Sequence, residues 1–167
     1  MFVLGIDPGV SRCGYGVVGR TSAGLRAVAC GVLTTPTTEP LPQRLASLNH
    51  ELRALLGEYE PTAVVVERVF FQTNVRTAMS VGQASGLALV AAADAGCEIA
   101  QYTANEVKQA VTGYGAASKE QVARMVQSLL ALPMVPKPVD AADALALALT
   151  HLAVRQVLVA AERAGTS

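Results

Sequence analysis

The chain of 167 residues has no tryptophan, only four tyrosines and three phenylalanines, and charged residues make up just 16% of it. Hydrophobic residues reach 51%, and this surplus excludes an intrinsically disordered chain. The three cysteines are isolated in the sequence and the histidines number two, which excludes a disulfide framework, a redox pair and an ordinary zinc site. We expect Cys13, Cys30 and Cys97 to be reduced thiols in the core of a cytoplasmic protein.

Long hydrophobic runs are also missing. The longest apolar stretches, at 84–93 and 144–149, are shorter than the roughly 20 residues that cross a bilayer. We therefore expect two buried core helices and no membrane association. The first residues reach a charge at Asp7, which argues against a secretory signal. The length predicts one domain that covers residues 1–167.

Hydrophobic periodicity predicts a mixed α/β domain. Short apolar runs at 2–7, 13–19 and 25–33, separated by turn signals, indicate an antiparallel meander. Leucines at helical spacing over 41–56 indicate an amphipathic helix, and the β-branched run at 62–66 indicates a central strand that is covered on both faces and parallel to the first. The other expected elements are helices at 74–95, 103–112, 118–131 and 139–163, and a strand at 98–102. The result is a five-stranded mixed sheet, three strands antiparallel and two parallel, flanked by helices.

Four carboxylates are the informative side chains. Asp7 ends the first predicted strand and Glu67 ends the central one, so both should lie at the carboxyl edge of the sheet, where α/β proteins bind ligands. Asp140 and Asp143 lie one helical turn apart in an otherwise apolar stretch. Because burying a lone carboxylate is costly, we expect these acids to face solvent, a cation or a metal. Together they predict one cluster of hard oxygen ligands.

Each acid also has a plainer interpretation. Asp7 could be a turn residue, Glu67 a solvated strand end and Asp140 a helix N-cap. A cap, however, does not need a second acid at Asp143. A cluster of four acids could hold two divalent cations about 4 Å apart, with Asp7 as the bridge, and this is the chemistry that phosphodiester hydrolysis needs.

The chain has no net charge, because 13 Lys and Arg balance 13 Asp and Glu, but its basic residues are unevenly distributed. All three lysines lie within 99–138, and two cations at the acid cluster would leave the rest of the surface mildly basic. Lys119 falls in the first helical turn behind a predicted Ser118–Gln121 capping box, where a cation opposes the helix dipole. Phosphate binding or a solvated helix face would both account for this stretch.

Two aromatic residues follow Glu67. Phe70 and Phe71 stand in a loop between Arg68 and Arg76. They could pack in the core, or they could form a stacking platform for an unpaired base beside the acids.

Five segments, in order over residues 1 to about 152, resemble the bacterial RuvC Holliday-junction resolvases. They are Leu-Gly-Ile-Asp-Pro-Gly at 4–9, Val-Val-Glu-Arg-Val-Phe at 65–70, Gly-Gln-Ala-Ser-Gly at 82–86, Asn-Glu-Val-Lys-Gln-Ala-Val-Thr-Gly at 105–113 and Asp-Ala-Ala-Asp-Ala-Leu-Ala at 140–146. The resemblance implies a ribonuclease H-like fold. It also implies a cytoplasmic homodimeric endonuclease that resolves four-way DNA junctions by paired symmetric nicks in recombination and repair, together with a branch-migration motor complex.

The resemblance also implies roles for single residues. It makes the four acids Asp7, Glu67, Asp140 and Asp143 ligands for Mg²⁺, two ions per subunit with substrate, with Mn²⁺ as a substitute. It places Lys108 and Lys119 in catalysis and substrate handling. It makes Phe70 the ring that stacks at the opened junction, with Phe71 and Arg76 as further candidate DNA contacts.

Two other functions compete with this interpretation. ATP-binding domains of the sugar kinase and actin type share the sheet and begin with strand-Asp-x-Gly, but they bind nucleotide between two domains. A non-catalytic junction-binding module would not need four acids. Ala78, Gly82, Ser85 and Gly86 on the predicted helix at 74–95 could serve a dimer contact or close packing on the sheet of the same chain.

Overall fold

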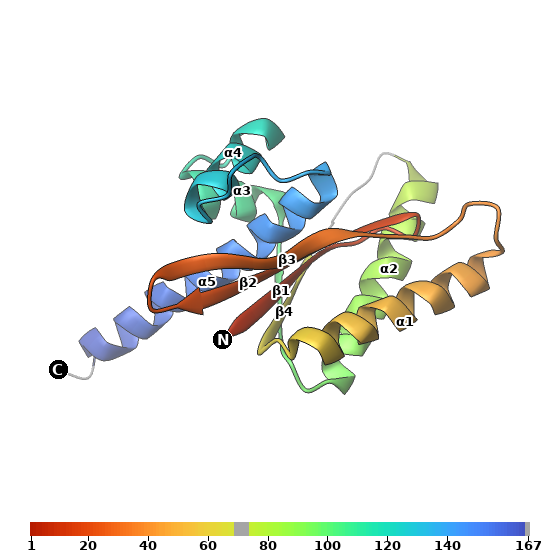
Figure 1. The fold of residues 1–167 in the computed structure, drawn as a ribbon, viewed down its shortest axis with the longest axis horizontal. Coiled ribbons are helices and arrows are strands. Elements are labelled where there is room, and N and C mark those ends of the chain that lie inside the picture. Colours follow the sequence, from red (N-terminus) through yellow and green to blue (C-terminus); the bar gives the residue numbers. More distant parts are fainter. Residues whose placement is uncertain (69–73, 166–167) are drawn as a thin grey trace.

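The computed structural model describes residues 1–68 and 74–165, which form a mixed sheet covered by helices on both faces (Figure 1). The strands are β1 (Phe2–Asp7), β2 (Arg12–Thr21), β3 (Gly24–Thr34), β4 (Ala63–Glu67) and β5 (Glu98–Tyr102). The helices are α1 (Leu41–Tyr59), α2 (Val75–Asp94), α3 (Ala104–Thr112), α4 (Lys119–Leu129) and α5 (Val139–Gly165). Element order and type agree with the prediction, and the boundaries differ by at most three residues.

The strands lie in the order β3-β2-β1-β4-β5. β1 pairs antiparallel with β2, and β2 with β3, while β4 runs parallel to both β1 and β5. This is the predicted arrangement of three antiparallel strands followed by two parallel ones. It confirms that the run at 62–66 belongs to a central strand.

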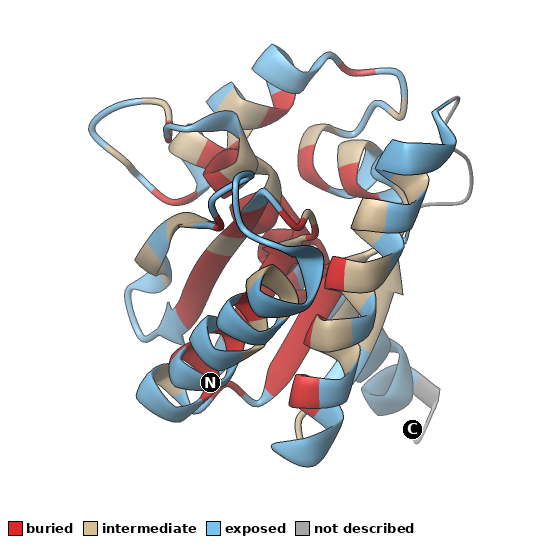
Figure 2. Ribbon diagram, turned by 90° about the vertical axis from the view of Figure 1, so that its right-hand side faces the viewer, coloured by how far each residue is buried: buried red, intermediate tan, exposed pale blue. Residues whose placement is uncertain are grey.

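The central strands bury side chains on both faces. On one face Leu4, Ile6 and Val64 pack against α1 and α2, and on the other Val3 and Val65 pack against α3, α4 and α5. Figure 2 shows the resulting buried layer between the exposed outer surfaces of the helices. Such double coverage explains why β4 is apolar throughout rather than alternating.

Glycines let α5 lie unusually close to the sheet. A Cβ added to Gly5 would lie 2.0 Å from the carbonyl oxygen of Ala144, and one added to Gly14 would lie 2.2 Å from that of Asp140. Gly16 meets Leu145 in the same way, at 2.7 Å from its backbone nitrogen. A side chain at any of these strand positions would push the helix away, so the glycines set the depth at which the start of α5 sits on β1 and β2.

Among the described residues, α5 is the one helix long and apolar enough to cross a membrane by length and composition. Half of its most apolar window is buried inside the protein, where Leu145 and Ala148 contact the sheet. Packing therefore accounts for the apolar sequence of its first turns. The later turns extend past the sheet and expose Val157 and Leu158 (Figure 1).

The cysteines match the prediction only in part. All three are free thiols, and Cys13 is fully buried. Cys30, however, is exposed, because β3 is an edge strand that the helices cover incompletely. The expectation that every cysteine lies in the core was wrong at this position.

Candidate active site

Two of the predicted acids meet at the ends of adjacent parallel strands. Ile6 of β1 pairs with Val66 of β4, so Asp7 and Glu67, which end these strands, lie side by side on the face covered by α5. Both side chains are half-buried, and the charge of Glu67 acts directly on Asp7. The edge of the sheet thus brings together two carboxyls that are 60 residues apart in sequence, as the strand ends predict.

The other two acids come from the first turn of α5. The helix begins at Val139, so Asp140 is already inside it, and the alternative that Asp140 is the N-cap does not hold. Its backbone rests on Gly14, which pairs with Asp7 across β1 and β2. Asp143 follows one turn later on the same side of the helix. The close approach of helix and sheet therefore adds this pair to the first.

The carboxylates of Glu67, Asp143 and Asp140 all act on the charge of Asp7. Burial, followed by the charges of Glu67, Asp143 and Asp140, raises the pKa of Asp7 from 3.8 to about 7. Burial and the charge of Asp143 also raise the pKa of Glu67. The charge of Lys119 acts in the opposite direction on both. Burial together with this repulsion weakens the ionisation of Asp7 at neutral pH, and added positive charge would favour its ionised form.

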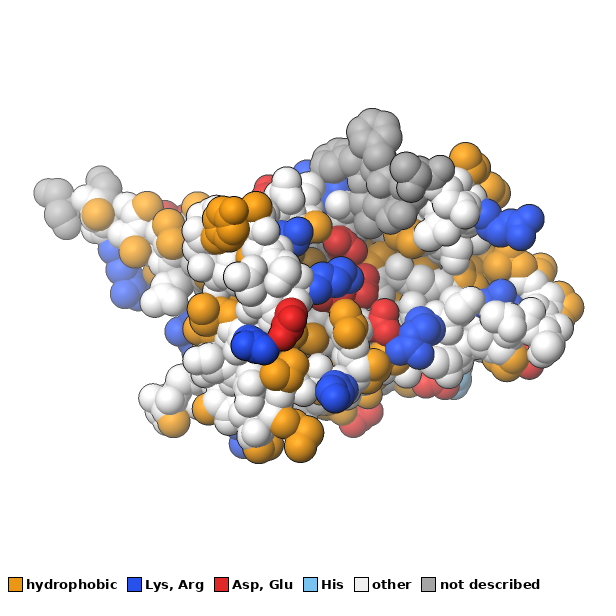
Figure 3. Space-filling view, turned by 90° about the horizontal axis from the view of Figure 1, so that it is seen from above, with side chains coloured by type: hydrophobic (Ala, Val, Ile, Leu, Met, Phe, Trp, Pro, Cys, Tyr) orange, Lys and Arg blue, Asp and Glu red, His pale blue; other side chains and the backbone are white. Residues whose placement is uncertain are grey.

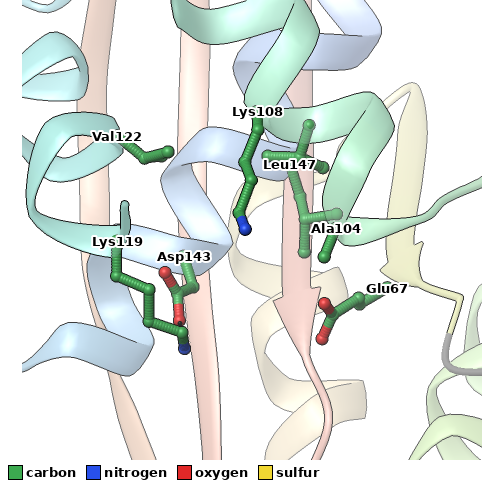
Figure 4. A pocket seen from close by; sticks show the side chains of 8 residues that line it. Glu67, Ala104, Lys108, Lys119, Val122, Asp143 and Leu147 are labelled. Carbon is green, nitrogen blue, oxygen red and sulfur yellow. Dashed lines mark hydrogen bonds and ion pairs between the residues drawn. The ribbon is translucent and has the colours of Figure 1, made fainter. Parts of the chain in front are cut away.

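A pocket of about 430 Å³ opens beside the acids (Figure 4). Glu67 and Asp143 line it together with the two lysines Lys108 and Lys119, and its remaining walls come from apolar side chains of α3, α4 and α5. In Figure 4 the lysines reach in from α3 and α4 while the carboxylates come from β4 and α5. Both lysines named by the sequence therefore lie at the acid site.

Lys119 is held in place by its helix start. Ser118 and Gln121 form the predicted capping box, so Lys119 is the first residue of α4. Its Nζ donates to Oδ2 of Asp143 at 2.6 Å. Desolvation lowers the pKa of Lys119, but the hydrogen bond and the charge of Asp143, with Asp7 and Glu67, outweigh it and raise that pKa overall. The side chain stays charged, although it stands where the helix dipole disfavours a cation.

Arg12 is a site residue that the sequence analysis missed. From the start of β2 its Nε and Nη2 donate to Oδ2 of Asp140, at 3.0 and 2.6 Å. The two residues are 128 positions apart and no motif links them, so only the fold reveals the pair. The two acids at the start of α5 are thus each paired with a cation from a different element, Asp140 with Arg12 and Asp143 with Lys119.

The donor set suits a hard divalent cation, because it consists of carboxylate oxygens alone. In the part of the chain that the structure describes, no three His, Cys, Asp or Glu side chains are arranged so that they could already hold a metal ion. Arg12 and Lys119 each contact an oxygen of one of these carboxylates, Oδ2 of Asp140 and Oδ2 of Asp143. Burial and then the neighbouring carboxylates disfavour the ionised form of Asp7, and a divalent cation would favour it.

Of the three further candidate DNA contacts, the described residues include only Arg76. Arg76 is exposed in the first turn of α2, outside the pocket, where its backbone nitrogen donates to the capping side chain of Asn74. Phe70 and Phe71 lie outside the described residues. Viewed from above, acidic side chains occupy a hollow near the middle of this face, with Lys and Arg side chains on both sides (Figure 3).

A polar pair connects β5 and α5 next to the site. Tyr102 is the register partner of Glu67 on β5, and its hydroxyl shares a 3.1 Å hydrogen bond with Nδ1 of His151 on α5. His151 is 2% exposed and lies two turns beyond Asp143. The pair therefore ties α5 to the strand next to Glu67.

Comparison with known proteins gives a consistent result. The family model described as "Crossover junction endodeoxyribonuclease RuvC" matches residues 3–151. Proteins of the same name from Natranaerobius thermophilus and Leifsonia xyli are 48% and 52% identical over 151 and 150 residues; these spans cover 90% and 89% of this chain and 94% and 72% of the relatives. The structure of Thermus thermophilus RuvC in complex with Holliday junction substrate superposes with a TM-score of 0.88 at 40% identity, over 94% of this chain and 96% of that one.

Proposed function

The chain belongs to the RuvC family of crossover junction endodeoxyribonucleases, and we propose that it resolves Holliday junctions by metal-assisted phosphodiester hydrolysis at the pocket beside Asp7, Glu67, Asp140 and Asp143, of which Glu67 and Asp143 line it. The observation that carries this assignment is the convergence of four acids from β1, β4 and α5 on one electrostatically coupled cluster. The fold is ribonuclease H-like, as the resemblance implied.

The four carboxylates would hold the metal. We take Mg²⁺ as the physiological ion, two per subunit when DNA is bound, and Mn²⁺ as a substitute, because both take oxygen ligands. Such ions activate a water for attack and stabilise charge on the departing oxygen of the phosphodiester. Asp7 is the best candidate to contact both, since its charge is coupled to each of the other three acids.

The residues of the chain itself then have distinct tasks. Asp7 and Glu67 are fixed by the strands, whereas Asp140 and Asp143 depend on how deeply α5 sits on the glycines of the sheet. Lys119 keeps its proton and stands next to the reacting phosphate, where it can balance the charge that develops there. Lys108 lines the same pocket from α3 and can contact the DNA backbone.

A homodimer would give paired nicks, because a four-way junction has two equivalent strands related by a two-fold axis. α2 offers a matching surface. Its sheet-facing side uses Ala84, Ala88, Ala91 and Ala92, while nothing lies within 4 Å of a Cβ built on Gly82 or Gly86. On the same outer side Val75, Met79 and Val90 are 73%, 61% and 56% exposed. Small residues flanked by apolar ones favour close helix contact between two copies.

Other features remain predictions from the family resemblance. They are the stacking role of Phe70 or Phe71, the DNA contact of Arg76, the cytoplasmic location and the work with a branch-migration motor. None of them enters the assignment of the active site.

The test is cleavage of a synthetic four-way junction in Mg²⁺ without ATP. We expect symmetric nicks from the parent protein and none from Asp7→Asn, and we expect that variant to keep junction binding, because the substitution removes a metal ligand and leaves the basic residues. Asp94→Asn, which changes an exposed acid paired with Arg53 far from the pocket, is the matched control. Normal nicking by Asp7→Asn would overturn the assignment, and ATP turnover without nicking would favour the kinase-like alternative.

A further inference from the structure

The guanidinium of Arg12 contacts only one carboxylate oxygen of Asp140. Nε and Nη2 both donate to Oδ2, and the side chain of Arg12 remains 52% exposed while that of Asp140 is 30% exposed. A bidentate Arg–carboxylate pair would use both oxygens and would be harder to separate. The pair therefore combines short contacts with an exposed geometry of the kind that contributes little to stability.

The backbone under Arg12 is anchored, in contrast to its side chain. The hydroxyl of Thr35 donates to the carbonyl of Val10 at 2.7 Å, and Nη2 of Arg44 donates to the hydroxyl of Ser11 at 2.6 Å. These bonds fix the turn between β1 and β2 next to the cluster. The exposed side chain of Arg12 can therefore change its partner without a rearrangement of this turn.

A divalent cation at the cluster would change the balance at Asp140. The cation attracts the carboxylate and repels the guanidinium, so the contact between Arg12 and Oδ2 becomes unfavourable. The guanidinium would then be an unpaired, half-exposed cation at the edge of the site to which a DNA phosphate must come. Its donor fork matches phosphate oxygens.

We propose that Arg12 is a DNA-phosphate contact that Asp140 holds back until the divalent cation binds. This proposal rests on the proposed function, because it takes Asp140 as a metal ligand. It makes cation binding and DNA binding mutually supportive, since each removes one partner of the Arg12–Asp140 pair.

A double-mutant cycle without metal tests the first half. Junction affinity is measured by fluorescence anisotropy in EDTA for the parent, Arg12→Gln, Asp140→Asn and the double variant. We expect Arg12→Gln to change affinity less than about twofold in the parent background, where Asp140 occupies Arg12. In the Asp140→Asn background the same change should weaken binding about 3- to 10-fold and reduce the salt dependence by about one phosphate contact. Equal effects in both backgrounds would overturn the proposal.

Calorimetry of Mg²⁺ binding without DNA tests the second part of the proposal, that the cation and Arg12 compete for Asp140. Arg12→Gln should bind Mg²⁺ roughly two- to fivefold more tightly than the parent, because the competing guanidinium is gone and exposed pairs of this kind are weak. Arg12→Lys keeps the charge, so it should stay near the parent value. Arg53→Gln is the matched control, because Arg53 makes an equally short 2.6 Å pair with Asp94 at 46% exposure.

Weaker Mg²⁺ binding by Arg12→Gln would contradict the proposal. If Arg12→Gln weakens Mg²⁺ binding, Arg12 merely orients Asp140 and the proposal is wrong. The same titration on Asp7→Asn separates this failure from a failure of the proposed function. Unchanged Mg²⁺ binding by Asp7→Asn would show that the metal site itself is misassigned, whatever Arg12 does.

Discussion

Replacing Asp7 by asparagine should abolish cleavage and at the same time stabilise the folded protein in EDTA. The reason is that burial and three neighbouring carboxylates raise the pKa of Asp7 from 3.8 to about 7. Folding therefore requires Asp7 either to stay protonated or to ionise among like charges. Asparagine keeps the shape of the side chain and removes this cost.

The expected gain in stability of Asp7→Asn follows from the raised pKa of Asp7. A rise of about 3 pKa units corresponds to about 4 kcal/mol for an ionised Asp7 above pH 7. Burying an amide in its place costs about 1 kcal/mol or more if its hydrogen bonds are incomplete. We therefore expect a net gain of about 2–3 kcal/mol, which for a domain of this length raises the melting temperature by roughly 4–10 °C.

The contribution of Asp7 to the free energy of unfolding depends on pH. Folded Asp7 holds its proton to a higher pH than the unfolded chain does, so this group costs the parent stability as pH rises from about 4 to about 7, and the loss then levels off. The variant lacks that decline. The difference in unfolding free energy between the two proteins should therefore widen from pH 5 to pH 8.

Urea denaturation in EDTA at both pH values measures the difference directly. Asp94→Asn is the control, since Asp94 is 55% exposed in a surface pair with Arg53 and its loss should change stability by less than about 1 kcal/mol. A variant Asp7→Asn that is less stable than the parent at pH 8 would refute the view that these four acids are mutually repulsive.

Three further predictions concern the surroundings of the cluster. Gly14→Ala should lower stability by about 3 kcal/mol and cleavage with it, measured by thermal melting and junction nicking, because its Cβ would lie 2.2 Å from the backbone oxygen of Asp140. His151→Gln should flatten the loss of stability below pH 6.5, measured by urea denaturation at pH 7.5 and pH 5, because burial lowers the pKa of His151 and the unfolded state binds its proton more readily. Lys119→Gln should slow single-turnover cleavage about 100-fold with junction affinity changed much less, and a purely structural role would instead lower the melting temperature without that separation.

Sequence reasoning succeeded where the chemistry follows from local pattern. Asp7 and Glu67 could be paired because each directly ends an apolar strand, and parallel strands end at one edge of the sheet. The capping box at Ser118 and Gln121 placed Lys119 correctly in the first turn of α4. In both cases the side chain and the element that positions it are neighbours in the sequence.

It failed where two distant segments decide the geometry. Nothing near Arg12 indicates a partner 128 residues away, although the start of the helix that carries this partner was predicted correctly. Gly14 in a strand pattern predicts only a bulge or a close approach, without saying of what. The helix that it admits is known only once the chain is folded, as is the pairing of Tyr102 with His151.

The neutral composition of the chain shows how local placement can reverse a global argument. Equal numbers of acidic and basic residues would ordinarily argue against DNA as a partner. Here four acids are gathered into one cluster, and Arg12 and Lys119 are paired with two of them. Divalent cations at the cluster would offset its charge and compete for the same carboxylates. Cation binding would lessen the repulsion between this face and a phosphate, so the cation would strengthen substrate binding as well as supply the chemistry.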